Sequence, residues 1–209
     1  MIRSTPSTSA RFAWLASLTS MVAMTVALST AAAAQTVSDS TFLDTDWSLT
    51  QFTTPAGGTS TGGQVLAGGN PGAFRNITDA LNNAPSPGTA SIVLSTSIYT
   101  PFTCSPGVSG AIGSLNYSED AACTASCFGA GQSTGPALLQ GGNLYISNSG
   151  AITGPALTWS TIALNGLTAA DFALVNVTST TLYDNTQHPD FSAGGRRSSS
   201  DSSAPTGPA

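Results

Sequence analysis

Basic side chains are almost absent from this sequence, and lysine is missing altogether. Only 7% of the 209 residues are charged, and Arg75 is the one arginine between Gln35 and Phe191. A protein that binds nucleic acid needs clustered lysine and arginine to neutralise phosphates, so we expect no nucleic-acid partner. The same shortage argues against binding to an anionic membrane surface.

Residues that commonly carry catalysis are also scarce. His188 is the only histidine, and its polar neighbours predict an exposed loop rather than a general base beside a nucleophile. Glu119, the only glutamate, lies next to Asp120. Neighbours on a strand point to opposite faces, so these two acids do not form the carboxylate pair of a glycosidase. The sequence therefore offers no catalytic set and does not point to an enzyme.

A long apolar run occurs only near the N-terminus. A basic start containing Arg3 is followed by the apolar segment Phe12–Leu28 and by the small residues Ala31–Ala34. These are the three parts of a secretory signal peptide. The apolar run is shorter than the roughly 20 residues of a membrane-spanning helix. We expect cleavage after Ala34, export of the protein and no transmembrane segment in the mature chain.

The remaining sequence predicts strands separated by turns. Short apolar or alternating runs recur between glycine, proline, asparagine and serine, which is typical of a β-sandwich or barrel. The predicted strands are Trp47–Phe52, Ala73–Ile77, Ser91–Ser95, Tyr99–Cys104, Gly113–Tyr117, Gly142–Ser147, Thr158–Leu164 and Phe172–Asn176. A short helix capped by Thr168 is predicted around Thr168–Asp171, and the glycines in Gln140–Asn143 predict a turn at a strand end. The stretch Thr54–Gln64, rich in glycine, threonine and serine, is predicted to be a loop.

The composition changes abruptly near the C-terminus. Residues 35–193 are predicted to form one β-sandwich domain, whereas no apolar residue larger than alanine or proline follows Gly194. Residues 194–209 are therefore predicted to be a disordered tail. One hypothesis is a shift of reading frame near Gly194, since Arg197–Pro208 can be encoded by codons that read as an apolar strand in another frame. The sandwich would then lack its last strand.

Three cysteines are present, namely Cys104, Cys123 and Cys127. In an exported protein they would meet an oxidising environment, so one disulfide is expected. We favour Cys123–Cys127 because both cysteines lie in one loop-like stretch, and Cys104 is the alternative partner. A zinc site is not expected, because four suitable ligands are missing.

Two acids near the first predicted strand are candidate calcium ligands. Asp44 and Asp46 flank Thr45, and carboxylate oxygens are the ligands that calcium prefers. The alternative interpretation is a solvated acidic turn. Further oxygen ligands could come from Asn70, Glu119, Asp120 or Asp190.

Arg75 and the aromatic residues could contact a ligand or serve the fold. Arg75 could clamp an anion, or it could pair with Asp79 four residues along the chain. The larger aromatic side chains could stack on sugar rings, or they could pack in the core. The candidate stacking residues are Trp47, Tyr117, Tyr145, Trp159 and Tyr183.

A resemblance to a known group of proteins covers most of the chain after the leader. It is carried by the segments Gly68–Arg75, Val108–Asp120, Gly131–Gly142 and Trp159–Phe172. They resemble a group of secreted bacterial proteins with a laminin-G/concanavalin-like jelly-roll sandwich. Many members end in a PEP-CTERM-type sorting anchor, which this sequence does not contain. The resemblance implies a jelly-roll fold and no catalytic residue.

Taken with the composition, these features favour a secreted, non-catalytic binding module for an extracellular glycan or matrix polymer. A structural surface-matrix protein without a small ligand is the first alternative, and an exposed aromatic platform would separate the two. A carbohydrate-active enzyme is the third hypothesis, and it would need two acids facing one cleft.

Overall fold

The computed structural model describes residues 34–54, 57–83, 91–124, 133–147, 150–151, 157–177 and 181–196. The predicted leader lies outside these residues, apart from Ala34. Within the described part of the chain, no helix is both long and apolar enough to cross a membrane.

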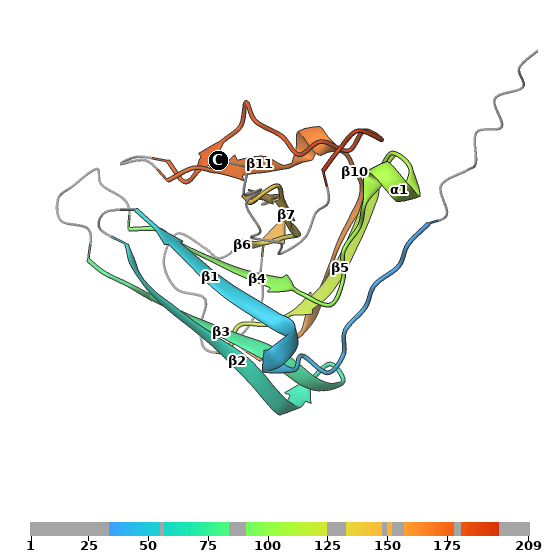
Figure 1. Cartoon of the computed structure of the whole chain (residues 1–209). Helices are drawn as coiled ribbons and strands as arrows, with labels where there is room; N and C mark the ends of the chain where they lie inside the picture. Colours follow the sequence, from blue (N-terminus) through green and yellow to red (C-terminus); the bar gives the residue numbers. More distant parts are fainter. Residues whose placement is uncertain are drawn as a thin grey trace, which may run out of the picture. The chain divides into compact units, whose positions relative to one another are not determined.

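Almost all of the regular structure is β-strand, which confirms the predicted all-β class (Figure 1). The strands are β1 (Trp47–Thr53), β2 (Gly58–Gly69), β3 (Gly72–Leu81), β4 (Val93–Tyr99), β5 (Leu115–Ala121), β6 (Ser133–Thr134), β7 (Ala137–Gln140), β8 (Asn143–Ile146), β9 (Gly150–Ala151), β10 (Ser160–Leu167), β11 (Ala173–Val175) and β12 (Tyr183–Asp184). The helices are single turns, η1 (Asp44–Asp46), α1 (Pro106–Ser109) and η2 (Ala169–Asp171).

Antiparallel pairing joins strands that lie far apart in the sequence. β1 pairs with β4 from Trp47↔Tyr99 to Thr53↔Val93, and β5 pairs with β10. β12, β11, β8 and β7 form a four-stranded sheet in that order, while β2 and β3 form a hairpin and β6 pairs with β9. The β1–β4 ribbon contacts the β2–β3 hairpin, and β4 also contacts β7. One ribbon therefore lies against two other groups of strands.

The predicted loop Thr54–Gln64 is wrong, because most of it belongs to β2 (Gly58–Gly69). Glycine normally weakens a strand, yet here it permits a close approach between backbones. A Cβ atom at Gly58 would collide with the carbonyl oxygen of Ala80 on β3. At Gly62 it would lie 3.3 Å from the carbonyl oxygen of Asn76. Tertiary pairing thus overrides the low strand propensity of this stretch.

The predicted strand Tyr99–Cys104 is also wrong. β4 ends at Tyr99, and a turn follows at Thr100 and Pro101, where proline has no amide hydrogen to extend the ladder. Other predicted strands are confirmed with shifted ends, among them β1, β3, β5, β8, β10 and β11.

Two predicted local signals are confirmed. The short helix is the turn η2, preceded by Thr168, whose amide and hydroxyl both donate hydrogen bonds to the Asp171 carboxylate. The glycine pair Gly141–Gly142 connects β7 to β8, and both residues have positive φ angles, of 59° and 83°. A two-residue hairpin turn of this kind requires positive φ at both positions, which glycine adopts without strain.

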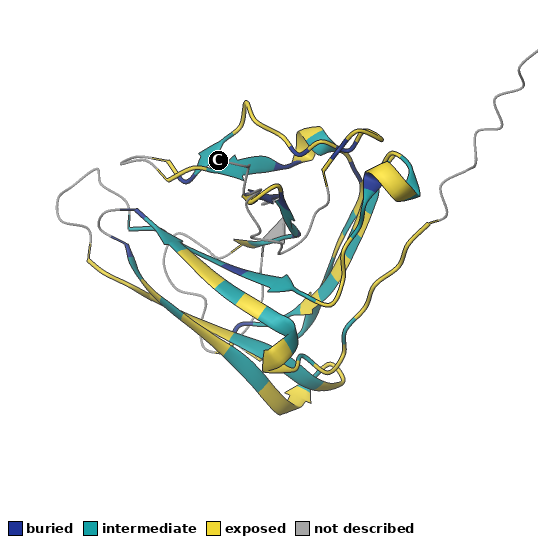
Figure 2. Ribbon diagram, viewed as in Figure 1, coloured by how far each residue is buried: buried dark blue, intermediate teal, exposed yellow. Residues whose placement is uncertain are grey.

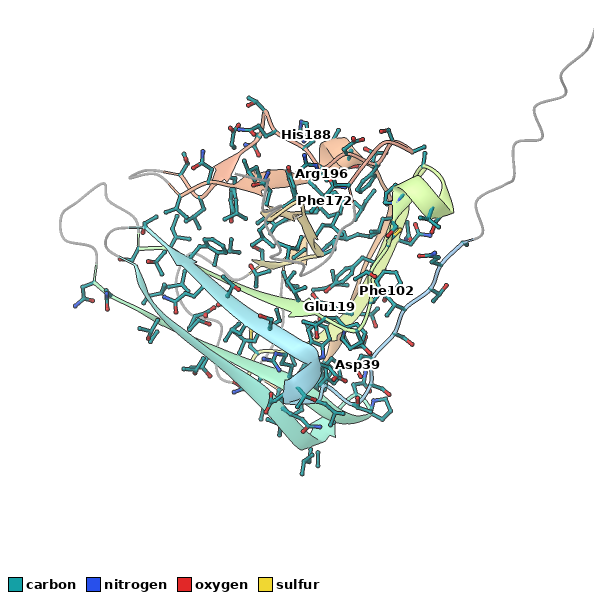
Figure 3. All side chains as sticks on the ribbon, in the orientation of Figure 1. Asp39, Phe102, Glu119, Phe172, His188 and Arg196 are labelled. Carbon is teal, nitrogen blue, oxygen red and sulfur yellow. The ribbon has the colours of Figure 1, made fainter. Side chains whose placement is uncertain are left out.

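The main apolar core is formed by Tyr145, Leu167, Phe172 and Phe191. Figure 3 labels Phe172, and Figure 2 shows that the buried stretches are short and lie among intermediate and exposed ones. Phe172 is 1% exposed, and its ring meets that of Phe191 edge to face at 5.9 Å. The residues packed around this cluster come mainly from β5, β7, β10 and β11, namely Ile112, Leu115, Tyr117, Leu138, Leu164, Ala169 and Leu174. The core therefore lies between the β5–β10 ribbon and the four-stranded sheet.

A polar layer joins the β1–β4 ribbon to the β2–β3 hairpin. The Gln51 amide donates to the carbonyl of Gly58 at 2.8 Å, and the hydroxyls of Ser60 and Ser95 lie 2.6 Å apart. Ser95 also hydrogen-bonds to Asp79 of β3. Hydrogen bonds thus hold these two ribbons together where apolar side chains are few.

The described chain continues three residues into the predicted tail. Gln140 is buried, donates to the carbonyls of Asp190 and Arg196 at 2.9 and 3.1 Å, and accepts from the Asp190 amide at 2.7 Å. Gly195 is buried against the carbonyl oxygen of Asp190. Residues 194–196 therefore pack on β7, while the rest of the predicted tail lies outside the described residues.

Candidate functional site

A cavity of about 220 Å³ lies between the β1–β4 ribbon and the β7–β8 hairpin. We call it the hydroxyl cavity, because serine and threonine contribute four of its lining residues. The lining consists of Ser48, Thr50, Phe52, Thr96, Ile98, Thr100, Leu139, Gly142 and Leu144.

The alternation of side chains along β1 and β4 explains why these residues share one face. Successive strand residues point to opposite faces, so Ser48, Thr50 and Phe52 lie together on β1. The register pairs Thr50 with Thr96 and Ser48 with Ile98 across the ribbon. The intervening residues, such as Gln51, face the β2–β3 hairpin instead.

The exposure of the lining residues distinguishes the mouth of the hydroxyl cavity from its floor. Ser48, Thr50 and Gly142 are exposed, so they mark the mouth. Thr96 is 4% exposed and Leu144 is 9% exposed, so they form the floor. A molecule entering from solvent would therefore meet the exposed residues Ser48 and Thr50 first.

The Thr96 hydroxyl is buried without a hydrogen-bond partner among the described residues. Leaving a buried hydroxyl unpaired costs about 1–3 kcal/mol, and such groups are few in folded proteins. By contrast, the Thr100 hydroxyl donates to the carbonyl of Asp46 at 3.1 Å. The Thr96 oxygen has almost no accessible surface, so it is enclosed in the wall of the cavity rather than open to it.

None of the described residues that line the hydroxyl cavity is charged. Its walls combine the apolar side chains of Phe52, Ile98, Leu139 and Leu144 with hydroxyl groups. A charged ligand group would lose its hydration there without meeting an opposite charge, at a high cost in free energy. The cavity is therefore suited to an uncharged molecule with both apolar and hydroxyl surfaces.

A second depression, open to solvent, lies on the β2–β3 hairpin. Its volume is about 270 Å³, and Thr61, Gly62, Gly63, Gln64, Val65 and Asn76 line it. None of these lining residues has a buried polar atom without a hydrogen-bond partner. None of these lining residues is buried, so this surface lacks the enclosed walls of the hydroxyl cavity.

The candidate calcium ligands Asp44 and Asp46 form the turn η1 directly before β1. Asp44 accepts hydrogen bonds from the Arg75 guanidinium at 3.0 Å and from the Gln64 amide at 2.9 Å. The described residues contain no group of three or more His, Cys, Asp or Glu that could hold a metal ion. The calcium site stays a prediction, and the Asp44 charge is already balanced by Arg75.

The remaining candidate oxygen ligands also have protein partners. The Asn70 amide donates to Asp120 at 3.3 Å, and the Thr161 hydroxyl donates to the same carboxylate at 2.6 Å. Asp190 accepts from the Ser192 amide at 2.9 Å, and Glu119 accepts from the Tyr117 hydroxyl.

Arg75 pairs with Asp44 rather than with Asp79, four residues along the chain. Its Nε atom also donates to the Ser97 hydroxyl at 3.2 Å. The expected i, i+4 pairing belongs to a helix, whereas Arg75 lies on strand β3. The Arg75 side chain is only 9% exposed, so its role here is to connect β3 with β4 and the turn η1.

Most of the candidate sugar-stacking aromatics serve the fold. Trp47 packs against Phe42 and Tyr99, with ring centroids at 6.0 and 5.1 Å. Trp159 meets Phe74 edge to face at 5.5 Å and donates to the carbonyl of Gly68 at 3.2 Å. Tyr145 is buried in the core.

The other two candidates, Tyr117 and Tyr183, are half-buried. The aromatic residue that lines the hydroxyl cavity is Phe52, which is not among the candidates predicted from the sequence. Alternate residues of a strand point to the same face, so the spacing of Ser48, Thr50 and Phe52 indicates that Phe52 shares a face with the other two.

The adjacent acids Glu119 and Asp120 point to opposite sides of β5. Glu119 is half-buried with Tyr117 on the inner face, whereas Asp120 is exposed. Burial, together with the nearby Glu119 carboxylate, raises the pKa of Tyr117 well above its ordinary value. The Tyr117 hydroxyl therefore stays protonated and donates to Glu119 at 2.8 Å. The two acids do not face a common cleft.

His188 is exposed, as predicted for a loop histidine. Its Nδ1 atom lies 2.7 Å from the carbonyl oxygen of Phe172, a contact that fixes the ring against the core (Figure 3). The Nδ1 atom of His188 is therefore occupied by a structural contact.

Cys123 is buried and disulfide-bonded, and Cys104 is half-buried. Cys127 lies outside the described residues, so the pairing Cys123–Cys127 stays a prediction.

The comparisons with known proteins returned no relative. No protein-family model, no curated protein and no solved structure matches this chain. The function is therefore inferred from the site itself.

Proposed function

We propose that this protein is a non-catalytic module that binds a neutral extracellular glycan in the hydroxyl cavity. The observation that carries the proposal is an uncharged cavity that combines apolar walls with the exposed hydroxyl residues Ser48 and Thr50. Binding sites for small molecules are concave and mostly apolar, with a few placed polar groups that fix orientation. A sugar ring presents the matching surfaces, namely apolar C–H faces and a rim of hydroxyls.

Export is part of the same proposal. A basic start, an apolar run and an alanine-rich cleavage site support secretion with cleavage after Ala34. We infer in addition that the sandwich is a jelly roll, as the resemblance implies, and the antiparallel pairing of distant strands supports this. N-terminal sequencing of protein recovered from the medium should start at Gln35, and retention of the leader would contradict the export proposal.

A pull-down on a panel of insoluble and soluble polysaccharides tests the binding proposal. The wild-type protein is compared with Thr50→Trp, which places a large side chain at the exposed mouth of the cavity. Thr59→Trp makes the same change at an exposed position of β2 and is the control. We expect retention by the wild type and the control, and loss of retention by Thr50→Trp.

Other outcomes would contradict the proposal in different ways. Equal retention of both variants would place binding outside the hydroxyl cavity. No retention by a folded, monomeric wild type would favour a structural matrix protein instead.

Removing calcium separates the glycan proposal from the predicted metal site. Because Arg75 already balances the charge of Asp44, we expect retention to be the same with calcium and with a chelator. Loss of retention in the chelator, and its recovery with added calcium, would restore Asp44 and Asp46 as ligands.

A further inference from the structure

We propose that Asn165 is a site of spontaneous deamidation, and that Asn116 slows the reaction by holding the backbone amide of Gly166. Asn165 is the only asparagine in the sequence that is followed by glycine. In such a pair no side chain hinders the glycine amide when it attacks the preceding asparagine, because glycine has no Cβ atom. Asparagine is one of the thermolabile residues of proteins. The proposal concerns β10 and is independent of the hydroxyl cavity.

The reaction needs no partner other than water. The backbone nitrogen of Gly166 loses its proton and forms a bond to Cγ of Asn165, and the side-chain nitrogen takes up a proton and leaves as ammonia. Water then adds to the resulting succinimide and breaks one of its two C–N bonds, which yields an aspartyl or an isoaspartyl residue. No electron is gained or lost, since one water replaces one ammonia.

The structure places this pair of residues in a β-bulge at the surface. β5 and β10 run side by side (Figure 1), and β10 advances three residues from Leu164 to Leu167 while β5 advances two. Asn165 and Gly166 fill the bulge, and both are exposed. The φ angle of Gly166 is 70°, and beyond its chain neighbours a Cβ atom there would meet no atom of the described residues within 4 Å. Water and base therefore reach the two residues that react.

Asn116 of β5 opposes the reaction. Its side chain lies on the exposed face of the strand, and its Oδ1 atom accepts a hydrogen bond from the Gly166 amide at 2.8 Å. This bond favours the protonated amide and keeps its nitrogen directed toward β5, whereas deamidation requires the nitrogen to lose its proton and approach the Asn165 side chain. The rate of deamidation therefore depends on how often this hydrogen bond opens, as it does for the exchange of a protected amide.

Deamidation at Asn165 should disturb the core, because the bulge sets the position of Leu167. Side chains three residues apart on a regular strand point to opposite faces, yet Leu167 is 8% exposed and Leu164 also packs against the main core. The extra residue in the bulge brings both leucines to the inner face. An isoaspartyl residue lengthens the backbone by one methylene at this point, so the modified protein should have a lower Tm than the unmodified one.

The test incubates the exported protein at pH 8 and follows the Asn165 peptide by mass spectrometry, with the urea-unfolded chain as the reference. The folded wild type should react more slowly than the unfolded chain. Asn116→Ala should accelerate the reaction by about two- to tenfold, the effect of losing one hydrogen bond. Asn116→Asp keeps an acceptor oxygen, and Ser118→Ala lies on the same exposed face, so both should stay within about twofold of the wild type. Asn165→Gln should abolish the reaction.

The outcomes separate the site, its protection and its consequence. No reaction at Asn165 even in the unfolded chain would overturn the site itself. Equal rates in the wild type and Asn116→Ala would overturn the role of Asn116. Acceleration in Asn116→Ala together with loss of amide protection throughout the chain would also overturn that role, because the variant would then be globally unfolded. Reacted protein that is separated by ion exchange and keeps the wild-type Tm would overturn the link to Leu167.

Discussion

Asp39 shows how one carboxylate can fix the segment that leads into the first strand. It accepts hydrogen bonds from the amide and hydroxyl of Thr41 at 2.8 and 2.7 Å, from the Phe42 amide at 3.1 Å, and from the Trp47 indole at 2.7 Å. Trp47 in turn packs between Phe42 and Tyr99. A single acid thereby orders an aromatic cluster at the start of β1.

The stability that Asp39 contributes should depend on pH. Burial alone would raise the pKa of Asp39, but hydrogen bonds from Thr41, Trp47 and Phe42 outweigh it and lower the pKa to about 2. The folded pKa is below the unfolded value of about 3.9, so the contribution is complete above about pH 4 and is lost as the pH falls towards 2. Asp39→Asn should lower the free energy of unfolding at pH 6 by about 1–2 kcal/mol.

Urea denaturation at pH 6, 4 and 2 checks this expectation. The wild type should lose more stability between pH 4 and 2 than Asp39→Asn does. Hydrogen bonds also lower the pKa values of Asp171, Asp184 and Asp190, so the difference between the two proteins, rather than the loss itself, reports on Asp39. Equal losses would contradict the role assigned to Asp39.

Phe172 is the side chain on which the main core most depends. It is 1% exposed and contacts Phe191, so Phe172→Ala should lower the free energy of unfolding by about 3–5 kcal/mol. Phe102→Ala makes the same change where 36% of the side chain is exposed, and its effect should be much smaller. Chemical denaturation of the two variants compares them directly, and similar losses would mean that the core lies elsewhere.

β2 contains glycine residues that leave room for the backbone of the neighbouring strand. Gly58→Ala would push a Cβ atom into the Ala80 carbonyl, so we expect it to lower the free energy of unfolding by about 1–3 kcal/mol. At Gly63 the nearest atoms to a Cβ are the Asp44 carboxylate oxygens at 3.7 Å, an ordinary contact. Gly63→Ala should therefore stay within about 0.5 kcal/mol of the wild type.

Hydrogen exchange locates the effect of these two glycine variants. Gly58→Ala should reduce the protection of amides in β2 and β3 before it affects the rest of the chain, because the hairpin opens as a local unit. Uniform loss of protection, or an equal effect of Gly63→Ala, would show that close backbone approach is not what β2 requires.

Strands with a clear local sequence pattern were predicted correctly, whereas a strand that depends on its pairing partner was missed. β1, β8 and β11 were predicted because apolar residues recur between turn residues, and the turn at Gly141–Gly142 was recognised by its glycines. β2 was missed because its glycines resemble a loop until β3 lies beside them. Similarly, Tyr99–Cys104 looked like a strand locally, although Pro101 ends the ladder after Tyr99.

For the molecule as a whole, Gln140 connects the end of the described chain to the four-stranded sheet. It is 8% exposed and makes hydrogen bonds with the backbone of Asp190 and Arg196. Gln140→Ala removes these three hydrogen bonds and the packing of a buried side chain, so the free energy of unfolding should fall by about 2–3 kcal/mol. Gln187→Ala, at an exposed position, should change it by less than about 0.5 kcal/mol.

Thermal denaturation and limited proteolysis test the Gln140 prediction. Gln140→Ala should lower Tm, and it should make the segment after Pro189 more susceptible to cleavage than it is in Gln187→Ala. A variant that kept the wild-type Tm and cleavage rate would show that residues 190–196 do not depend on this contact.

Composition and local pattern were sufficient for the all-β class, the short helix η2 and the expectation that His188 is exposed, because each of these depends on residues close together in the chain. The partners of Asp44, the hydroxyl cavity and the unsatisfied hydroxyl of Thr96 were decided only in three dimensions. Asp44 meets Arg75 from 31 residues away, and Thr96 and Leu144 line one cavity because β4 contacts β7, the hairpin partner of β8. Long-range strand pairing sets those contacts, and a local pattern does not specify which distant strands will pair.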